Sequence, residues 1–332
     1  MRARADGGNA RRVPARAGLQ TSDLGIGEDE LARLFEPFVL QGPAGSAQAW
    51  TREVARRKRK LAKATAQRLL FGWLPRMQRR EATVLQEYNK AWQAIDYGTY
   101  SLDAQQTEMT PWQWRERRMF ASDVGATRFR QLLLIRAIER VQPQHVLEVG
   151  CGNGINLMLL SCRFPDIAFT GLELTEAGHE AALRFQARHA ALPEAIQAYA
   201  PLPLPDPAAF RRIRFVRGNA ADLPFDDRSF DLTYTVLALE QMERLRERAL
   251  SEIARVTRGH TLMIEPFRDV NRAFWPRLNV LRRDYFRGRI DELPRHGLEP
   301  VLTLDDFPQE AFLKTCAVLA ERRAARSLAP AA

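Results

Sequence analysis

Short apolar runs recur between residues 145 and 322, and stretches with the spacing of amphipathic helices separate them. Apolar runs bounded by turn residues are typical of buried strands, and their alternation with helices predicts βαβ units. The expected strands lie at 145–149, 169–174, 261–266, 298–304 and 313–320. One more strand ends within 214–225, and another runs into its loop within 229–241. The pattern therefore predicts an α/β fold with a mostly parallel sheet that helices cover on both faces.

The first fifty residues show little periodicity of either kind. Residues 1–27 are rich in Arg, Ala and Gly, and we expect them to be disordered. Residues 29–35 are predicted to form one short helix that Pro37 ends, and the Gly, Pro and Ser residues of 42–46 favour a linker. We therefore expect residues 1–50 to form a disordered or linker-rich tail.

A basic helical extension is expected over residues 51–130. Residues 81–142 favour helices, with a turn around Tyr97 and a helix start at Thr110, where Thr would cap the helix and Pro111 would occupy its first turn. The last helix before the first strand has an apolar face made of Leu132, Leu133, Ile135, Ala137 and Ile138.

Charge is concentrated in the N-terminal quarter of the chain. Residues 1–80 hold 17 Lys and Arg against 7 Asp and Glu, whereas residues 81–332 hold 33 of each, so the first 80 residues carry the whole net charge of +10. Residues 52–80 combine 11 basic residues with an apolar patch at 69–75. Such a stretch fits a solvated helix docked on the domain, an RNA-binding arm or a helix at an anionic membrane surface.

Composition excludes several classes of protein. A chain of 332 residues that is 45% hydrophobic can build one large α/β domain with an appended piece, and it is neither fibrous nor wholly disordered. Three scattered cysteines and five histidines favour neither a disulfide framework nor a metal site. No run is apolar enough to span a membrane, and residues 1–25 lack the apolar core of a secretory signal. We expect a cytoplasmic protein, soluble or peripheral to the inner face of the membrane.

The clearest chemical signal follows the first strand. Gly150, Gly152 and Gly154 come directly after it, and a helix is predicted to begin at Ile155. Glycine at these positions permits a tight turn and a close approach of the backbone to a ligand. The segment therefore predicts a loop that binds a nucleotide-type cofactor.

The spacing of the three glycines is GxGxG. A dinucleotide fingerprint requires its third glycine at residue 155, where this chain has Ile155. Glu148, two residues before the loop, would repel a phosphate but could support a ligand with an ammonium group. A nicotinamide-dependent dehydrogenase is therefore the less favoured enzyme class.

The segment Val146–Gly154 resembles the first motif of the class I S-adenosylmethionine-dependent methyltransferases, within the broad group that includes the ubiquinone and menaquinone biosynthesis enzymes. The resemblance extends over residues 130–265. It implies a Rossmann-like, seven-stranded, mostly parallel sheet with an antiparallel last strand. We place the methyltransferase domain at residues 131–322, with a helical insertion at 267–294 and a disordered tail at 323–332.

The resemblance also implies which residues contact S-adenosylmethionine. The glycine loop would pack against the methionine part, and Glu173, at the end of the second strand, could accept both ribose hydroxyls. Asn219 stands where the family usually has Asp, and its side-chain oxygen can still accept a hydrogen from the adenine amino group. The expected contacts are Glu148, Gly150, Cys151, Gly152, Gly154, Glu173, Leu174, Asn219, Ala220, Thr235 and Val236.

Aromatic residues and arginines gather before the first motif. In related enzymes the corresponding segment folds over the cofactor, so we expect the extension at 51–130 to supply a lid. Aromatic faces there could hold a planar acceptor or contact a sulfonium. The rings in question are Tyr97, Tyr100, Trp112, Trp114 and Phe120.

The catalytic residue stays unassigned. Methyl transfer requires mainly that the acceptor is aligned and water excluded, and a base is needed only when the acceptor must lose a proton. Glu240 and Gln241 occupy the expected rim of the site, and the other candidate bases are Glu265, Asp284 and His296. Each of them also fits a surface or strand-end polar role.

The favoured function is transfer of a methyl group from S-adenosylmethionine to an oxygen of a small-molecule or lipid-linked acceptor. Residues 235–238 lack the motif of enzymes that methylate adenine or glutamine amino groups, and the cysteines do not fit a pyrimidine methyltransferase. Two alternatives stay open. One is an RNA or protein methyltransferase that docks through residues 52–80, and the other is a non-catalytic S-adenosylmethionine-binding module.

Overall fold

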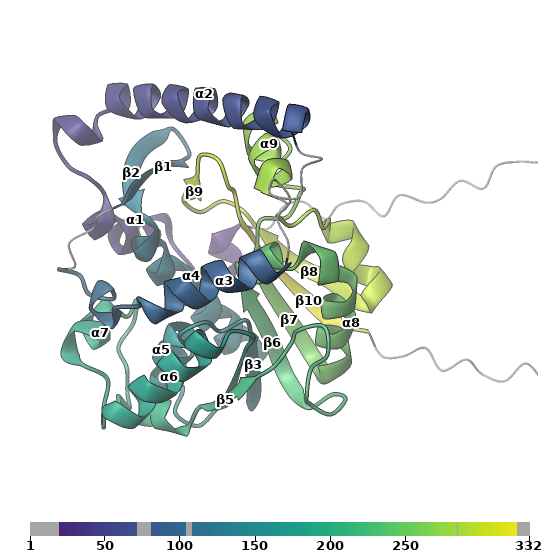
Figure 1. Cartoon of the computed structure of the whole chain (residues 1–332). Coiled ribbons are helices and arrows are strands. Elements are labelled where there is room, and N and C mark those ends of the chain that lie inside the picture. Colours follow the sequence, from purple (N-terminus) through teal and green to yellow (C-terminus); the bar gives the residue numbers. More distant parts are fainter. Residues whose placement is uncertain (1–19, 72–80, 104–107, 284, 324–332) are drawn as a thin grey trace, which may run out of the picture.

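A computed structural model describes residues 20–71, 81–103, 108–283 and 285–323, with the backbone alone at residues 71 and 81–85. Its centre is a seven-stranded sheet with helices on both faces (Figure 1), which confirms the predicted fold class. The strand order is β5-β4-β3-β6-β7-β10-β8. The strands are β3 (His145–Val149), β4 (Ala168–Glu173), β5 (Arg214–Arg217), β6 (Phe230–Val236), β7 (Thr257–Glu265), β8 (Leu298–Leu304) and β10 (Cys316–Arg322).

The direction of the last strand agrees with the prediction. Strands β3 to β7 pair in parallel, whereas β10 is antiparallel to both of its neighbours, β7 and β8. Parallel pairing brings the carboxyl ends of β3, β4, β5 and β6 to the same edge of the sheet. Ligands bind at this edge in open α/β sheets, next to the point where the strand order reverses.

Alternate residues of each strand enter two separate cores. Val146, Leu232 and Leu262 pack against α4 (Asp123–Val141) and α5 (Ile155–Arg163), and Leu147 and Met263 pack on the other face against α8 (Arg246–Val256). A side-chain period of two along each strand produces this division. Both faces of the sheet are therefore covered, as its apolar strands require.

The remaining helices are α1 (Glu28–Phe35), α2 (Ala47–Phe71), α3 (Glu81–Gln93), α6 (Glu176–Arg188), α7 (Glu194–Tyr199) and α9 (Phe274–Arg283).

A second, three-stranded antiparallel sheet corrects the helical prediction for residues 81–142. Residues around Thr110 begin no helix but form β1 (Met109–Trp114), which pairs with β2 (Arg117–Ser122) and with the short β9 (Gln309–Glu310). The turn between β1 and β2 contains Arg115 with a φ of 54°. A tight hairpin usually has Gly or Asn at such a position, so Arg115 did not indicate a turn.

Residues 20–46 belong to the folded domain, which corrects the expectation of a disordered or linker-rich tail over 1–50. Leu31, Phe35 and Phe38 are buried, and the ring of Phe35 lies 5.2 Å from that of Trp112 and 5.9 Å from that of Phe129. The backbone N–H and hydroxyl of Thr21 donate to the carboxylate of Asp306. Of the tail expected at 323–332, Arg323 is described, and its N–H donates to the carbonyl of Gly297 at 2.9 Å. Residues 1–19 and 324–332 lie outside the described residues.

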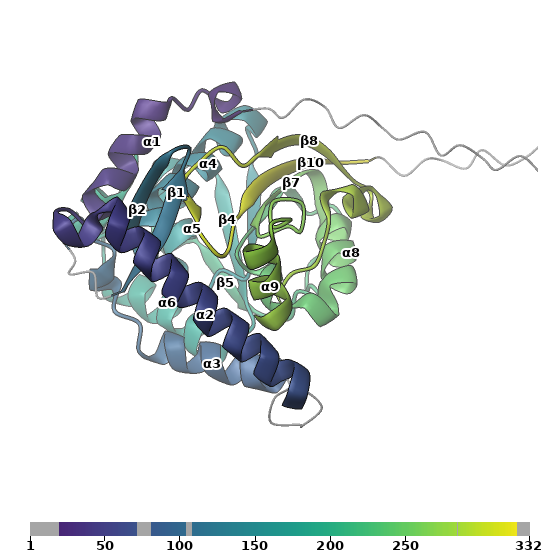
Figure 2. The same ribbon diagram turned by 90° about the horizontal axis from the view of Figure 1, so that it is seen from above.

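The basic stretch is helical, as expected, up to Phe71. In Figure 2, α2 crosses over the β1–β2 hairpin and runs alongside α9. Trp50, Val54 and Leu61 form its buried side and pack with Phe120 and Phe312. The helix therefore docks its apolar side on the domain, while most of the apolar patch at 69–75 lies outside the residues whose side chains are described.

The segment expected as a helical insertion, 267–294, holds α9 and the start of a short 3-10 helix over Ile290–His296, joined by irregular chain. Within the described residues, every helix is too short or too polar to cross a bilayer.

Truncating Phe35 tests whether the N-terminal segment is part of the domain. We expect Phe35→Ala to lower the free energy of unfolding by about 3–5 kcal/mol, because it leaves a cavity between α1, α4 and β1. Leu40→Ala, at a side chain that is 36% exposed, is the control and should cost less than about 1 kcal/mol. Chemical denaturation measures both, and equal small losses would mean that the segment contributes nothing to the fold.

Candidate functional site

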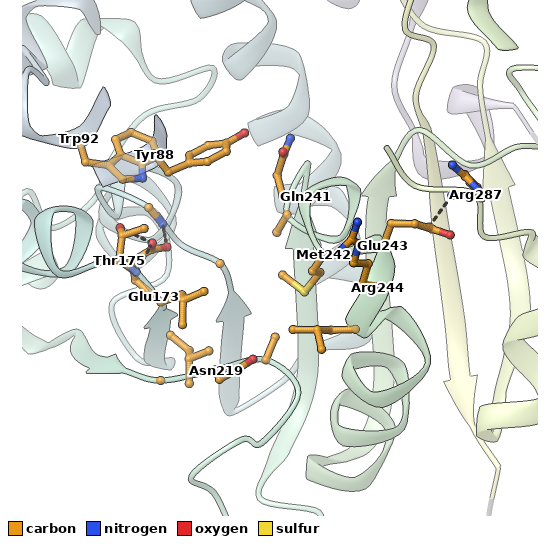
Figure 3. Close-up of a pocket in the computed structure, with 18 residues that line it drawn as sticks. Tyr88, Trp92, Glu173, Thr175, Asn219, Gln241, Met242, Glu243, Arg244 and Arg287 are labelled. Carbon is orange, nitrogen blue, oxygen red and sulfur yellow. Dashed lines mark hydrogen bonds between the residues drawn. The ribbon is translucent and has the colours of Figure 1, made fainter. Parts of the chain in front are cut away.

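A pocket of about 390 Å³ opens at the carboxyl ends of β3 to β6 (Figure 3). Helix α3 lies over one side of it, and the connection between β6 and α8 forms the opposite side. The lining residues are Tyr88, Trp92, Gly150, Gly152, Leu172, Glu173, Leu174, Thr175, Gly218, Asn219, Ala220, Ala238, Gln241, Met242, Glu243, Arg244, Leu245 and Arg287.

The glycine loop between β3 and α5 forms the floor of the pocket. Gly150 and Gly152 have φ values of 79° and 54°, a region that side chains with a Cβ rarely adopt. A Cβ at Gly150 would lie 2.6 Å from the Cβ of Ala238, and a Cβ at Gly152 would lie 2.5 Å from the ring of Trp92. Both positions therefore require glycine for conformation and for space.

The carboxylate of Glu173 joins this loop to the end of β4. Its Oε2 accepts the Gly152 N–H at 2.9 Å, and its Oε1 accepts the Thr175 N–H at 2.9 Å and the Thr175 hydroxyl at 2.5 Å. The side chain lines the pocket, although the residue is only 6% exposed. A carboxylate has about four acceptor positions, so one remains for a ligand hydroxyl.

Asn219 follows β5 and stands on the neighbouring wall. Its side-chain oxygen accepts the Ala221 N–H at 2.9 Å, and its backbone oxygen accepts the Asp222 N–H at 3.0 Å. Side chains of this type fix turns by bonding the backbone two residues on. The turn places Asn219 and Ala220 beside Leu172 and Leu174 in the pocket.

The floor continues along the β6–α8 connection, which the carboxyl group of Glu265 holds in place. Its two oxygens accept the N–H groups of Ala238 at 3.0 Å, Leu239 at 3.1 Å and Glu240 at 3.3 Å. Burial raises the pKa of Glu265 to about 7, although these hydrogen bonds act in the opposite direction. Ala238 and Gln241 thus come to line the pocket.

Glu240 lies behind this wall. It is buried, it accepts a hydrogen bond from the amide of Gln241, and it is not among the lining residues. Burial, followed by the charge of Glu265, raises its pKa to about 8. Of the two rim residues expected from the sequence, Gln241 therefore faces the pocket and Glu240 supports it.

Five of the expected cofactor contacts do not line the pocket. The Glu148 carboxyl is turned away from it, since it accepts hydrogen bonds from Asn156 at 2.9 Å and Tyr234 at 3.0 Å, and burial raises its pKa to about 7. The buried residues Cys151 and Gly154 lie in the loop, and Thr235 and Val236 end β6 beneath the pocket. Gly150, Gly152, Glu173, Leu174, Asn219 and Ala220 do line it.

Candidate bases farther along the chain have other partners or are not described. The ring of His296 lies 3.1 Å from the Glu247 carboxylate and 3.0 Å from the Ser251 hydroxyl, both on α8, and it is not a lining residue. Asp284 lies outside the described residues. In the described part of the chain, no cluster of His, Cys, Asp and Glu is suited to a metal ion.

The aromatic cover of the pocket comes from α3, which the sequence analysis did not single out. Tyr88 and Trp92 line the pocket, and the Asn89 side chain accepts the Ala177 N–H at 3.2 Å, which fixes α3 to α6. Figure 3 shows both rings above Glu173 and Thr175. Their spacing of four residues on a helix was the available signal, because it places them on one face.

The expected lid residues have different positions. Tyr97 donates to the carbonyl of Asn153 at 2.7 Å, and the Tyr100 hydroxyl accepts from the Asn153 amide at 3.3 Å, so both support the glycine loop from outside the pocket. Trp112, Trp114 and Phe120 belong to the β1–β2 hairpin and are not lining residues.

Comparison with known proteins identifies the central segment. Residues 147–264 match the family model described as a methyltransferase domain. The chain is 36% identical over 115 residues to a phthiotriol/phenolphthiotriol dimycocerosates methyltransferase of Mycobacterium tuberculosis, a match that covers 35% of this chain and 34% of the relative. It is 32% identical over 118 residues to a fatty-acid O-methyltransferase of Mycolicibacterium smegmatis, a match that covers 36% of this chain and 35% of the relative. The matches thus span about a third of the length of these relatives.

Among solved structures, the magnesium protoporphyrin IX methyltransferase from Synechocystis with bound SAH aligns with 14% identity and a TM-score of 0.42, covering 60% of this chain and 82% of that one. The family match includes the glycine loop, Glu173, Asn219 and the strands β4 to β6, which build the pocket. Residues 147–264 are thus similar to a methyltransferase domain, and they include most of the strands of the central sheet.

Proposed function

We propose that the protein transfers a methyl group from S-adenosylmethionine to an oxygen of a small-molecule or lipid-linked acceptor. The observation that carries the proposal is the pocket formed by the glycine loop, Glu173 and Asn219 at the carboxyl edge of the sheet. Relatives named as a fatty-acid O-methyltransferase and as an O-methyltransferase support oxygen as the acceptor atom. A lipid-type acceptor is supported by the same fatty-acid enzyme and by the dimycocerosates methyltransferase.

The residues of the pocket fit this cofactor. Gly150 and Gly152 line the pocket and carry no side chain, so an amino-acid moiety could approach their backbone closely. Glu173 retains one acceptor position for a ribose hydroxyl, and the apolar side chains of Leu172 and Leu174 offer contact area to an adenine ring. When bound, S-adenosylmethionine would supply a methyl group on a positively charged sulfur.

The chain's own part in the reaction is alignment and exclusion of water. Tyr88 and Trp92 cover the pocket from α3, and aromatic faces favour a neighbouring positive charge. Gln241 presents an amide at the opposite wall, where it could hydrogen-bond an acceptor oxygen. Ordered contacts of this kind lower the entropic cost of bringing two reactants together.

Removal of an acceptor proton would need a base close to the pocket. Glu240 contacts the lining residue Gln241, and its charge is balanced in part by Arg130 and Arg283. Glu240 does not line the pocket, so we propose that it acts through Gln241, whose amide it holds in place beside the acceptor. Contact of residues 52–80 with an anionic surface, and a location in the cytoplasm, stay predictions.

Calorimetry with the Glu173→Ala variant tests the cofactor. We expect the wild type to bind S-adenosylmethionine and S-adenosylhomocysteine but not NAD, and the variant to bind both about 10- to 150-fold more weakly, because hydrogen bonds to charged groups contribute about 1.5–3 kcal/mol. Glu176→Ala removes a neighbouring carboxylate whose side chain is 62% exposed, and it should leave the affinity unchanged. A wild type that binds neither compound would overturn the proposal.

The pH dependence of stability tests the buried state of Glu240. Its pKa is raised from 4.5 to about 8, so the folded state holds its proton more tightly than the unfolded state does. This contribution to stability is fully present below pH 4.5 and is lost as the pH rises through about 8. Between these two pH values the free energy of unfolding of the wild type should fall as the pH rises. We expect Glu240→Gln to make this fall less steep, by up to about 1.4 kcal/mol per pH unit.

Denaturant titrations across this pH range provide that measurement. Glu194→Gln, at an exposed carboxylate on α7, is the matched control and should follow the wild-type pH profile. Identical profiles for the wild type and Glu240→Gln would show that Glu240 titrates as an ordinary exposed carboxyl group.

Transfer of labelled methyl groups tests the acceptor class. With labelled S-adenosylmethionine and a panel of fatty acids and hydroxylated lipids, we expect the label to enter the organic phase. Mild base would release it from a methyl ester but not from a methyl ether, which distinguishes a carboxyl acceptor from a hydroxyl acceptor. Label recovered in RNA or protein instead would favour the basic docking arm and contradict a lipid-type acceptor.

A further inference from the structure

An arginine-lined surface pocket of about 460 Å³ lies outside the proposed cofactor site, beside α9. Its lining consists of one carboxylate and four guanidinium groups, contributed by Asp269, Arg268, Arg272, Arg277 and Arg289. Four cations around one hollow favour an anionic ligand, and planar guanidinium groups suit phosphate oxygens well.

Two of the four arginines have acidic partners. Arg272 lies 3.6 Å from the Asp269 carboxylate, and Arg289 forms an ion pair with Asp291. The Asp269 carboxylate also accepts the Ile290 N–H at 2.9 Å. Arg268 and Arg277 have no carboxylate within ion-pair distance in the part of the chain that the structure describes. The hollow therefore keeps a positive charge that its own acids do not cancel.

Large apolar side chains project next to these arginines. Phe274 is 68% exposed and Leu281 is 42% exposed, and with Arg277 they lie on one face of α9 because they are three and four residues apart. Leu69, at the end of α2, is 82% exposed. The Arg68 guanidinium donates to the carbonyls of Leu281 and Arg282, which keeps this end of α2 beside α9.

The arginine-lined pocket and the proposed cofactor site are separated by one further pocket, which shares lining residues with both. A third pocket, of about 240 Å³, shares Arg268 and Arg277 with it and is also lined by Leu281, Phe286 and Arg287. Arg287 in turn lines the cofactor pocket, and Figure 3 shows it at the far end, where its backbone N–H donates to Glu243 at 2.7 Å. Three neighbouring hollows thus lie between the α9 surface and the site.

We propose that α9 and the arginine-lined pocket dock the protein on an anionic phospholipid bilayer. The guanidinium groups bind lipid phosphates, while Phe274, Leu281 and Leu69 enter the boundary between headgroups and acyl chains. Basic side chains beside large apolar ones are what an interfacial segment requires. This docking surface goes beyond the proposed methyl transfer, and it would place the entrance to the adjoining hollows at the lipid.

A bilayer fits this surface better than RNA does. Single-stranded RNA is bound by aromatic rings that stack on successive bases along a basic groove. Among the described residues, Phe274 is the only largely exposed aromatic side chain, and the exposed apolar side chains near it are Leu69 and Leu281. Transfer of a leucine side chain from water to the acyl chains of a bilayer is favourable. A leucine side chain has no ring on which a nucleic-acid base could stack.

Vesicle sedimentation with charge-matched variants tests the proposal. We expect the full-length protein to bind vesicles of phosphatidylcholine mixed with phosphatidylglycerol, and to bind pure phosphatidylcholine vesicles far more weakly. Arg268→Gln combined with Arg277→Gln should lower the partition coefficient for anionic vesicles roughly 30-fold, because each basic residue near such a surface contributes about 1 kcal/mol. Phe274→Ser should lower it about tenfold or more by removing the apolar anchor.

Matched controls lie at the β5 end of the sheet. Arg188→Gln combined with Arg211→Gln removes the same charge from exposed positions, and Leu183→Ser removes an apolar side chain that is 39% exposed on α6. Both control proteins should bind vesicles within about twofold of the wild type.

Three results would overturn the docking proposal. They are a wild type that binds RNA but no vesicle, equal losses in the α9 variants and their controls, and full binding by the α9 variants. Circular dichroism and calorimetry with S-adenosylmethionine on the same variants verify that they are folded. Because sedimentation requires neither the cofactor nor methyl transfer, failure of docking and failure of the proposed function are distinguishable.

Discussion

The carboxylate of Glu173 connects parts of the chain that come from three elements. It ends β4, accepts the N–H of Gly152 from the loop after β3, and accepts two hydrogens of Thr175 at the start of α6. These bonds set the distance between the glycine loop and the wall of the pocket. Thr175 also caps α6 by accepting the Gly178 N–H, and α3 packs on α6, so the aromatic cover is positioned through the same contact.

Part of this arrangement could be predicted from sequence because it is local. The glycine loop, the acid at the end of β4 and the turn at Asn219 each lie within a few residues of a strand end, and parallel pairing brings strand ends together. The side-chain direction of Glu148 could not be predicted in this way. It depends on hydrogen bonds from Asn156, which lies on α5, and from Tyr234, which lies on β6.

The regions that were predicted wrongly depend on distant partners. Phe35 and Phe38 pack against the rings of Trp112, Phe129 and Tyr199, which lie 77 to 161 positions away in the sequence. No local pattern reveals such contacts. The β1–β2 hairpin turns at Arg115 without a glycine, and its third strand is the short segment Gln309–Glu310 near the other end of the chain. The cover formed by Tyr88 and Trp92 was missed because a pair of rings on a helix is more often part of a core.

Pairing between β1 and β9 has a consequence for folding during synthesis. The N-terminal hairpin leaves the ribosome long before its partner strand at residues 309–310. The hydrogen bond between Thr21 and Asp306 likewise cannot form until Asp306 has been made. The strand β10, which separates β7 from β8, is also made late. Such long-range pairing slows folding and leaves strand edges uncovered meanwhile. Newly made chains should therefore depend on chaperones until the C-terminal residues have been added.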